Sequence, residues 1–555
     1  MTYQKSAFRI CTTLLAFFIF LISSQAQPLS KKAAFTHQDT LRGTNMPDRA
    51  WWDAKHYAIS VTPDYATKTI RGQNTMVFSA LKPGNKMQID LQEPMQLDAV
   101  IFQNNKLSFT REGNTFTVEF PTEVQPGTAN QLVMQFSGKP REAIRPPWDG
   151  GWIWQKDENG SPWMSVACQG VGASVWYPCK DLQSDEPDSA SLTMIVPDSL
   201  VAVGNGRLRD VKPASAGKKS YTWAVINPIN NYNIIPYIGK YVNFTETFMG
   251  EKGKLDCSYW VLDHDLEKAK AQFTQAAKML KCFEHWFGPY PFYEDGYKLV
   301  ESPHLGMEHQ SAVAYGNKFK NGYLGRDLSG SGWGLKWDFI IVHESGHEWF
   351  ANNITTNDIA DMWVHEGFTN YSETLFTTCE FGVEAGNDYV IGTRKNIQND
   401  IPIIGHYGVN QEGSGDMYYK GGNLLHTIRQ VINDDEKFRQ ILRGLNKDFY
   451  HQTVDSKQVE AYISEKSGID LSRVFDQYLR TTVIPILEYR KTPDGIQYRW
   501  SNTISGFNLP LKVSSSKTVW IQPTDNWKVL TKSEGYNGST FTVDRNFYVQ
   551  VVKTN

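Results

Sequence analysis

His343, Glu344 and His347 have the types and the spacing of two metal ligands with an acid beside them. On a helix, residues i and i+4 lie on one face, so both imidazoles can reach the same ion. Glu366 follows His347 by nineteen positions (366 − 347 = 19) and can provide a third ligand. Three nitrogen or oxygen ligands leave the fourth position of a zinc ion open for a water molecule. We therefore predict one catalytic Zn²⁺ per chain.

The segment that contains Glu366 indicates a second helix, DMWVHEGFTNYSETLF. Its apolar residues recur at roughly helical spacing: they are Trp363, Phe368, Tyr371 and Leu375. Glu373 lies seven positions after Glu366 and therefore on the same face. It could orient a ligand imidazole through a hydrogen bond, and a solvated surface carboxylate is the alternative.

Residues 1–26 have the pattern of a signal peptide. Lys5 and Arg9 precede the apolar run TTLLAFFIFLI, and Ser24-Gln25-Ala26 resembles a small-x-small cleavage site. The apolar run is short for a membrane span. We expect export to a periplasm or to the outside, with no stable membrane span after removal of the signal. An uncleaved anchor is the alternative.

The composition after this segment is that of a well-cored globular protein, long enough for about three domains. Hydrophobic residues make up 40% of the chain and aromatic residues 13%. The net charge of −3 argues against nucleic acid as a partner, and we expect a monomer. Five cysteines follow the signal segment, with no C-x-x-C pair: Cys168, Cys179, Cys257, Cys282 and Cys379. One disulfide is possible, and the sequence does not indicate which.

Three regions follow one another along the chain. Residues 31–48 are polar and expected to be loose. Alternating apolar and polar residues and frequent turn signals predict an all-β domain over 45–240. It contains an aromatic cluster, which a sheet core or a cleft wall explains better than sugar binding: Trp148, Trp152, Trp154, Trp163 and Trp176.

Helical periodicity dominates residues 241–480, which we predict to be the catalytic domain. A helical stripe covers 264–288 and ends at Gly288-Pro289, and a short strand follows over 297–300. The Gly/Ser-rich stretch 322–334 is expected to be a flexible loop that leads into the helix of His343. Amphipathic helices then continue to about Leu479. Residues 481–555 return to a strand pattern and predict a small β-sandwich.

Two further motifs flank the metal-binding residues: Gly306-Met307-Glu308-His309 upstream and Tyr418-Tyr419-Lys420-Gly421 downstream. With HESGH and the spaced Glu366, they resemble the aminopeptidase N type of gluzincin, peptidase family M1. The resemblance covers nearly all of the chain after the signal. It implies a multidomain α+β protein with an N-terminal β saddle, a thermolysin-like α/β catalytic domain and a C-terminal β-sandwich.

The resemblance also implies a role for each motif residue. His343, His347 and Glu366 would bind zinc, and Glu344 would be the general base. Glu308 would bind the free amine of a peptide substrate, and Gly306 and Met307 would line its backbone. Tyr418 would stabilise the oxyanion, and Gln169 stands where the family has a second amine-recognising residue. Tyr419 in place of Tyr418, and a structural role for Gln169, are the alternatives.

The chain departs from the family pattern at several positions. His309 and His365 each replace a usual Asn, and Gly346 lies inside the zinc helix, where it costs about 0.5–1 kcal/mol relative to Ala. The loop between Glu308 and His343 is long, and no large helical domain follows the sandwich, so we expect an open cleft. His304 and His309 are not expected to bind metal.

Together these features predict an exported zinc aminopeptidase that acts on peptides with a free N-terminus. Water activated by zinc would attack the first peptide bond, and pairing of Glu308 with the terminal ammonium would place that bond at the metal. The alternatives are epoxide hydrolysis at the same site, a thermolysin-type endopeptidase, and a binding protein with an inactive zinc site. Side-chain preference does not follow from the sequence.

Overall fold

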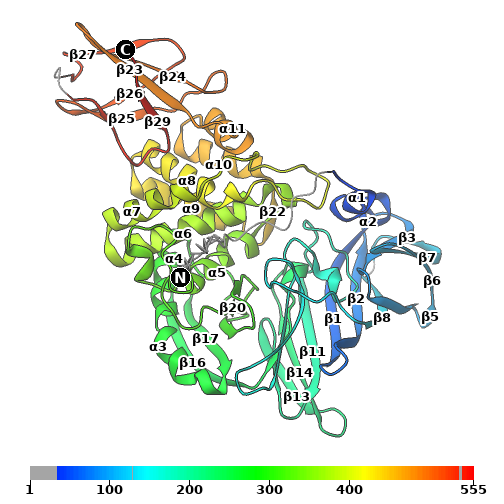
Figure 1. Cartoon of the computed structure of the whole chain (residues 1–555). Helices are drawn as coiled ribbons and strands as arrows, with labels where there is room; N and C mark the ends of the chain where they lie inside the picture. The colour runs from blue at the N-terminus through cyan, green and yellow to red at the C-terminus, as the bar shows by residue number, and fades with distance from the viewer. Residues whose placement is uncertain (1–33, 128, 537–539) are drawn as a thin grey trace, which may run out of the picture.

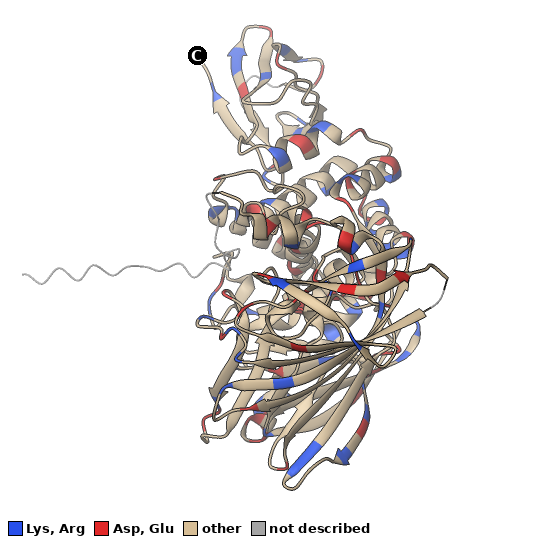
Figure 2. Cartoon of the chain, turned by 90° about the vertical axis from the view of Figure 1, so that its right-hand side faces the viewer, with Lys and Arg blue, Asp and Glu red and all other residues tan. Residues whose placement is uncertain are grey.

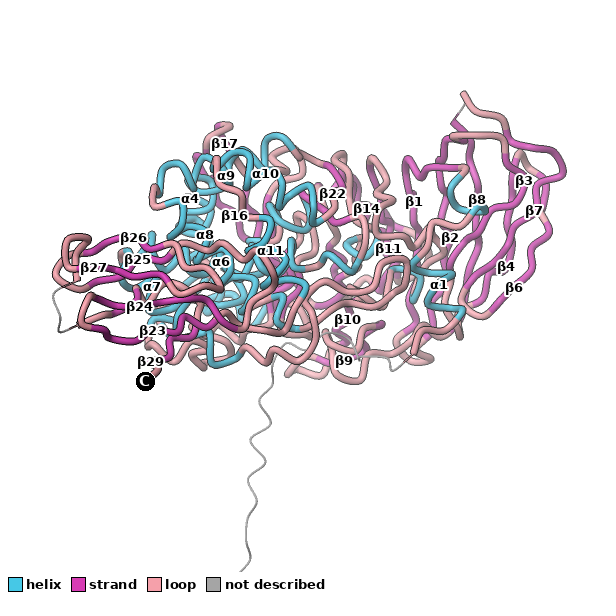
Figure 3. The backbone as a smooth tube through the Cα atoms, turned by 90° about the horizontal axis from the view of Figure 1, so that it is seen from above, coloured by secondary structure: helices cyan, strands magenta, loops and turns pink. Residues whose placement is uncertain are grey.

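The computed structural model describes residues 34–127, 129–536 and 540–555. A strand-rich N-terminal part, a mostly helical central part and a small strand-rich C-terminal part follow one another along the chain (Figure 1). Seen from above, the helices lie between the two strand-rich parts (Figure 3). This architecture confirms the predicted multidomain α+β fold class. The predicted signal peptide lies outside the described residues.

The N-terminal part is built on an eight-stranded sheet of order β13-β14-β11-β1-β2-β8-β4-β5. Two smaller sheets, β3-β7-β6 and β12-β15-β10-β9, pack with it. The strands are β1 Trp52–Asp64, β2 Thr69–Ala80, β3 Gly84–Asp90, β4 Gln96–Phe102, β5 Asn105–Lys106, β6 Ser108–Glu112, β7 Thr115–Val124, β8 Ala129–Gly138, β9 Gly151–Lys156, β10 Pro162–Ala167, β11 Ser189–Pro197, β12 Val201–Val203, β13 Arg207–Pro213, β14 Lys218–Val225 and β15 Tyr237–Gly239. Trp152, Trp154 and Trp176 lie in its core, so these aromatic residues serve packing.

The expectation that residues 31–48 are loose is wrong for their described part. Helices α1 (His37–Gly43) and α2 (Pro47–Ala50) occupy it. The Thr36 hydroxyl caps the Asp39 amide while the Asp39 carboxylate accepts from the Thr36 amide, which satisfies two free N–H groups at the start of α1. Local capping therefore orders a segment with little apolar content.

The central part begins with a five-stranded sheet of order β16-β17-β18-β20-β19, which places β19 at an edge. Its strands are β16 Tyr241–Gly250, β17 Gly253–Leu262, β18 Tyr297–Glu301, β19 Gly306–Met307 and β20 Val313–Tyr315. The single helix predicted over 264–288 is two helices, α3 (Leu266–Gln272) and α4 (Gln275–Phe287). At the break, the Thr274 hydroxyl donates to the Ala271 carbonyl at 2.8 Å and so competes with the backbone.

Helices cover the rest of the central part, as predicted. They are α5 Phe339–Gly346, α6 Trp363–Phe381, α7 Val383–Thr393, α8 Tyr419–Ile432, α9 Asp435–Asp448, α10 Ser456–Ser467 and α11 Ser472–Arg480, with the short strands β21 Ile354–Thr356 and β22 Gln452–Val454 between them. Every residue of α6 from Trp363 to Thr377 is buried. Because α6 packs against α4, α5, α7 and α8, it is the central element of this part.

The long loop before α5 is held by side-chain hydrogen bonds. The Asp327 carboxylate accepts from the Ser329 amide at 2.9 Å and from the Gly332 amide at 2.6 Å. The Asn317 amide group donates to the Gly322 carbonyl at 2.8 Å. The Gly/Ser-rich stretch that was expected to be a flexible loop has an irregular backbone, and these hydrogen bonds hold it in place at several positions.

The C-terminal strands form a four-stranded sheet, β27-β24-β23-β29, and a three-stranded sheet, β26-β25-β28. They are β23 Ile486–Thr492, β24 Gly495–Ser501, β25 Leu511–Ser514, β26 Thr518–Ile521, β27 Lys528–Thr531, β28 Thr542–Val543 and β29 Gln550–Lys553. Their buried residues, such as Leu487, Trp500 and Phe547, belong to the same apolar cluster as the catalytic helices. The two regions therefore share one core. The domain limits chosen from the sequence stay a prediction.

Charged residues of both signs are interspersed over the face seen in Figure 2. Among the described residues, no helix has the length and apolar character needed to cross a membrane.

A disulfide joins α4 to α6 through Cys282 and Cys379. The remaining described cysteines, Cys168, Cys179 and Cys257, are free and buried. The bond closes a loop across a sequence separation of 97 residues and fixes the end of α6 that lies away from Glu366. We therefore assign to it a stabilising role for the helix on which the site is built.

Replacing both cysteines of this pair by serine is expected to lower the free energy of unfolding by about 2–4 kcal/mol, because the unfolded chain gains freedom. Thermal unfolding with and without reductant checks this: reductant should lower the melting temperature of the wild type and leave that of the variant unchanged. Titration of the unreduced, unfolded mature protein should find three reactive thiols. A result of five would show that the bond does not form.

Candidate active site

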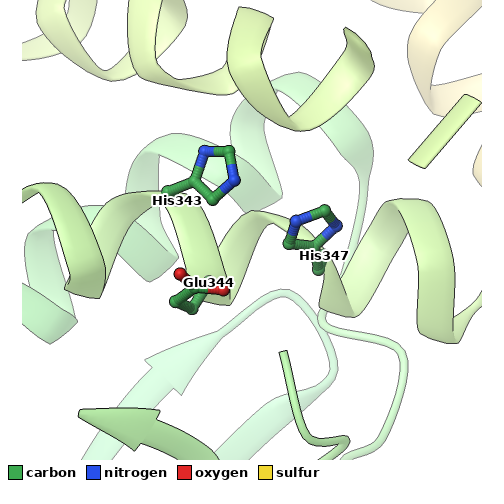
Figure 4. A group of neighbouring side chains, drawn as sticks. All are labelled: His343, Glu344 and His347. Atoms are coloured by element: carbon green, nitrogen blue, oxygen red, sulfur yellow. The ribbon is translucent and has the colours of Figure 1, made fainter. Parts of the chain in front are cut away.

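Helix α5 carries His343, and His347 directly follows its last residue. The start of α5 is fixed by Asp338. The Asp338 carboxylate accepts from the Ile340 and Ile341 amides at 3.1 and 3.4 Å, which caps the helix. Figure 4 shows the imidazoles of His343 and His347 one turn apart, with the Glu344 carboxylate nearby. One ligand atom from each of these three residues lies within 4.8 Å of the others.

The chain turns sharply just after His347. Phe350 and Ala351 leave helical geometry, and Ala351 has a φ of +143°, which is a strained conformation for a residue with a side chain. The turn brings the Phe350 carbonyl within 3.0 Å of His347 Nδ1. With Nδ1 donating to this carbonyl, His347 Nε2 carries a lone pair that can face a metal.

Helix α6 brings Glu366 to the two imidazoles. Glu366 Oε2 lies 3.3 Å from His347 Nε2 and 3.7 Å from His343 Nε2. Ligands around a tetrahedral zinc ion, with bonds of about 2.0–2.1 Å, lie about 3.3–3.4 Å apart. Burial opposes ionisation of Glu366, but the histidines outweigh it and hold its pKa below the usual range. Its Oε2 is buried and has no hydrogen-bond partner, so the three groups fit a zinc ion.

Glu373 orients the first histidine from the same face of α6, as its spacing predicted. Glu373 Oε1 lies 2.7 Å from His343 Nδ1, and Tyr389 donates to Glu373 Oε2 at 2.6 Å. The carboxylate is fully buried, which rules out a solvated surface role. His343 is also held between two rings, with centroid distances of 5.1 Å to Phe339 and 6.1 Å to Tyr418.

Gly346 allows the two helices to approach. A Cβ atom there would lie 2.6 Å from Ser372 Oγ and 3.1 Å from Thr369 Cγ2, both on α6. Close packing of α5 against α6 therefore explains the glycine at this position. Since the separation of α5 and α6 sets the distance from the histidines to Glu366, this glycine is part of the geometry of the site.

Glu344 is buried beside the histidines and faces β19. Burial raises the pKa of its carboxyl to about 7, which suits a group that exchanges protons near neutral pH. A Cβ atom at Gly306 would lie 2.7 Å from Glu344 Oε1. The glycine in β19 thus leaves the room that the carboxylate occupies.

Tyr418 reaches the ligands from the start of α8. The Lys420 ammonium donates to the Thr481 carbonyl at 2.9 Å, and a Cβ atom at Gly421 would lie 3.0 Å from the Gly367 Cα atom of α6. These contacts fix the register of the turn. Burial raises the pKa of Tyr418 well above its usual value, with contributions from Glu366, so the hydroxyl stays protonated and can donate. Burial also raises the pKa of Tyr419, but the carboxylate that adds to this effect is Glu373 and not Glu366.

Glu308 follows β19 and is 2% exposed. The Tyr232 hydroxyl donates to Glu308 Oε1 at 2.9 Å, and the Asn352 side chain donates to the Glu308 carbonyl at 2.8 Å. Burial raises the pKa of Glu308. The N-terminal part of the chain thus contributes, through Tyr232, to the placement of a carboxylate in the central part.

All nine residues predicted from the sequence line one cleft with an empty volume of about 950 Å³, which includes space open to solvent. They are Gln169, Gly306, Met307, Glu308, His343, Glu344, His347, Glu366 and Tyr418. Gln169 follows β10, and its Nε2 atom is buried without a partner. Trp148 also lines the cleft, so this tryptophan of the aromatic cluster is a wall residue.

Two substitutions in the family motifs lie outside the lining of this cleft. His309 Nδ1 makes a short hydrogen bond with the Tyr237 hydroxyl, and His365 Nε2 accepts from the Thr356 amide at 2.9 Å. Both imidazoles support backbone or packing around the motif residues.

Tyr232 and Glu412 are site residues that sequence reasoning missed. Tyr232 is a buried aromatic with no local signal that distinguishes it from core. Glu412 lies in the loop VNQEGSGD before α8 and lines the cleft. In the sequence, the one feature that pointed to Glu412 as a site residue was its position six residues before Tyr418.

Comparison with known protein families identifies the chain. The Peptidase family M1 domain matches residues 271–478, and the Peptidase M1 N-terminal domain matches residues 53–232. The chain belongs to peptidase family M1. This membership confirms the resemblance inferred from the motifs and implies zinc as the cofactor.

Individual relatives are distant. The M1 chain is 20% identical to Aminopeptidase 2 of Candida albicans over 465 residues, which are 79% of this chain and 48% of that protein. It is 22% identical to Leukotriene A-4 hydrolase of Xenopus laevis over 441 residues, 74% of this chain and 68% of that protein. It therefore spans about half the length of Aminopeptidase 2.

Solved structures show the same fold. An M1 zinc metallopeptidase from Deinococcus radiodurans aligns with a TM-score of 0.66 and 20% identity, over 78% of this chain and 94% of that one. A mutant of an M1 zinc metallopeptidase from the same organism, bound to a Tyr-Ser-Ala substrate, aligns with a TM-score of 0.66 and 20% identity, over 78% of this chain and 95% of that one.

Substituting Glu373 by Gln is expected to weaken zinc binding about 10- to 100-fold, because the partner that orients His343 loses its charge. Competition with a chromophoric chelator measures the affinity. Glu380→Gln is the matched control, since Glu380 lies on the same helix α6 but is exposed. Equal affinity in both variants would contradict the orienting role of Glu373.

Proposed function

We propose that this M1 protein is an exported zinc aminopeptidase that removes N-terminal residues from peptides and acts as a monomer. The observation that carries the proposal is the position of Glu308, a buried carboxylate in the same cleft as the three zinc-binding groups. A carboxylate at this position suits a substrate whose terminal ammonium lies one residue from the peptide bond that is cut.

We assign the ligand role to His343, His347 and Glu366, whose donor atoms converge at zinc-like separations. A zinc ion held there supplies a Lewis acid that lowers the pKa of water and polarises the scissile carbonyl. Glu344 takes a proton from the attacking water and passes it to the leaving amine. Its pKa, raised by burial to about 7, supports both steps.

Tyr418 donates its hydroxyl hydrogen to the oxygen that becomes negative as the carbonyl is attacked. Burial keeps this hydroxyl protonated. A donor aimed at a developing oxyanion in a water-poor site contributes typically ~10²–10³ in rate. The Tyr418 ring lies with its centroid 6.1 Å from that of His343 and lines the same cleft as Glu308, which supports this role.

Glu308 binds the terminal ammonium, with Gln169 beside it in the cleft wall. Gly306 and Met307 lie on β19, the edge strand of its sheet, which pairs with β20 on its other side. The free edge offers backbone groups to an extended peptide. The ammonium site thus fixes where the N-terminus of the substrate binds, and the edge strand fixes the direction in which its backbone runs.

This arrangement favours an exopeptidase over the alternatives. An internal peptide bond brings no cation to Glu308, which disfavours a thermolysin-type endopeptidase. Epoxide hydrolysis leaves the ammonium site without a use. A binding protein with an inactive site is disfavoured because the three ligands, Glu344 and Tyr418 all line the cleft.

The disulfide between Cys282 and Cys379 supports export, because such bonds persist in oxidising compartments. Cell fractionation with the native N-terminus intact tests this: we expect the mature protein outside the cytoplasm, with its N-terminus near residue 27. Recovery of an unprocessed cytoplasmic protein would refute export.

Aminoacyl fluorogenic amides and their N-acetylated forms test the exopeptidase function directly. The wild type should cleave only the free-amine substrates, and Glu308→Ala should lower kcat/KM by about 10²-fold or more, because the ammonium loses a charged partner. Equal cleavage of acetylated substrates would point to an endopeptidase. No cleavage by a zinc-loaded protein would point to a binding function.

Removing the Tyr418 hydroxyl by Tyr418→Phe should reduce kcat by ~10²–10³ with little change in KM, because the donor acts on the developing oxyanion. Tyr419→Phe is the matched comparison, since Tyr419 is adjacent in sequence and also lines the cleft. Zinc content, measured in both variants, should match the wild type. A larger loss in Tyr419→Phe would reverse the assignment of the two tyrosines.

A further inference from the structure

One carboxylate in the cleft has no role in the reaction described above. Five lining residues are acidic: Glu308, Glu344, Glu366, Glu373 and Glu412. The first four bind the amine, act as base, bind zinc and orient a ligand. Glu412 comes from the loop before α8, outside the motifs of the family.

The loop that carries Glu412 is held firmly in place. The Asn410 side chain donates to the Gly170 carbonyl at 3.1 Å, and its amide donates to the Asp39 carbonyl of α1 at 3.2 Å. On the other side, a Cβ atom at Gly413 would lie only 1.9 Å from the Ile403 carbonyl oxygen. Glu412 therefore lies on a fixed wall, beside the turn that contains Gln169.

Glu412 has no charge partner in the protein. Within the described ranges it makes no hydrogen bond or ion pair, and no lysine or arginine lines the cleft. Burial raises the pKa of Glu412 to about 8, and the carboxylates of Glu366 and Glu308 add to this effect. Glu412 is partly exposed, so a cation that enters the cleft can reach its carboxyl group and stabilise the charged form.

The position of Glu412 selects which part of the substrate reaches it. The carboxylates of Glu366 and Glu308 help to raise the pKa of Glu412, and the Glu412 carboxylate in turn helps to raise the pKa of Tyr418. The loop of Glu412 is bound to Gly170, and Asn410, Gly170 and Tyr232 line one hollow. Glu412 therefore comes from the same side of the cleft as Tyr232, the hydrogen-bond partner of Glu308. The group that a bound peptide places on that side is the side chain of its first residue. Met307 and Trp148 also line the cleft and offer apolar surface for a long aliphatic or guanidinium-bearing stem.

We infer that Glu412 binds the cationic side chain of an N-terminal arginine or lysine and thereby gives the enzyme a preference for basic first residues. The inference rests on the proposed aminopeptidase function. It assigns Glu412 to substrate specificity and not to catalysis.

Paired substrates test it: arginyl and citrullyl amides, which differ in charge and hardly in shape, and lysyl and norleucyl amides. In the wild type, kcat/KM should favour the charged member of each pair. Glu412→Gln should lower that ratio about 10- to 100-fold, as loss of hydrogen bonds to a charged group implies. Glu412→Asp should retain part of the preference, because it keeps the charge. Glu123→Gln, an exposed site on β7, is the control and should keep the wild-type ratio.

Two outcomes would overturn the inference. An unchanged ratio in Glu412→Gln would show that the carboxylate does not contact the side chain. An equal fall for arginyl and citrullyl amides would show that Glu412 serves the α-amine or the wall instead.

A binding measurement separates this inference from the proposed function. Calorimetry with zinc-loaded Glu344→Ala protein, which should not turn over substrate, compares arginine amide with citrulline amide. Tighter binding of arginine amide, lost when Glu412→Gln is added, supports the inference even if the wild type hydrolyses no substrate of the panel. Equal binding of the two amides would refute it.

Discussion

The contact between α5 and α6 is the constraint on which the site depends. His343 lies on α5, His347 directly follows it, and Glu366 lies on α6, so the distances among these three groups depend on the separation of the two helices. Gly346 sets this distance because its missing side chain lets Ser372 and Thr369 approach. The buried charged groups then stabilise one another: Glu366 lies beside Nε2 of both histidines, and Glu373 lies within hydrogen-bond distance of His343 Nδ1. Removing one of them would leave a buried charge uncompensated.

The end of the cleft around Glu308 depends on a different contact, the one between the N-terminal and central parts. Tyr232 and Gln169 reach the cleft from the N-terminal part, and Asn230 donates to the carbonyl of the strained Ala351 at 3.0 Å. Ala351 lies in the turn that places the Phe350 carbonyl on His347. The position of Glu308 relative to His347 is therefore a property of both parts together, and neither part fixes it alone.

Within one helix, spacing along the sequence predicts spacing in space, whereas the resemblance to a family was needed for Glu308, Gln169 and Tyr418. His343 and His347 share a face because they are four apart, and the same reasoning placed Glu373 with Glu366. Long-range partners gave no such signal: Tyr232 and Glu308 are 76 positions apart, and the disulfide pairs cysteines 97 apart. Only the packing of whole elements brings these groups together. Helix α1 is the opposite case, since its capping pair Thr36 and Asp39 was visible but its polar composition suggested a loop.

Helix α1 also has a consequence for how the protein assembles. The Thr44 hydroxyl, just after α1, donates to the Gly408 carbonyl at 2.6 Å across 364 positions of sequence, and Asp39 accepts from Asn410. During synthesis, the partners of α1 leave the ribosome long after it does, and closing so long a loop is slow. One wall of the cleft thus stays unfinished until the first and the late segments of the chain meet. A nascent or partly folded chain that already holds α5 and α6 would lack this wall of the cleft until residues 408–410 bind to the segment around α1.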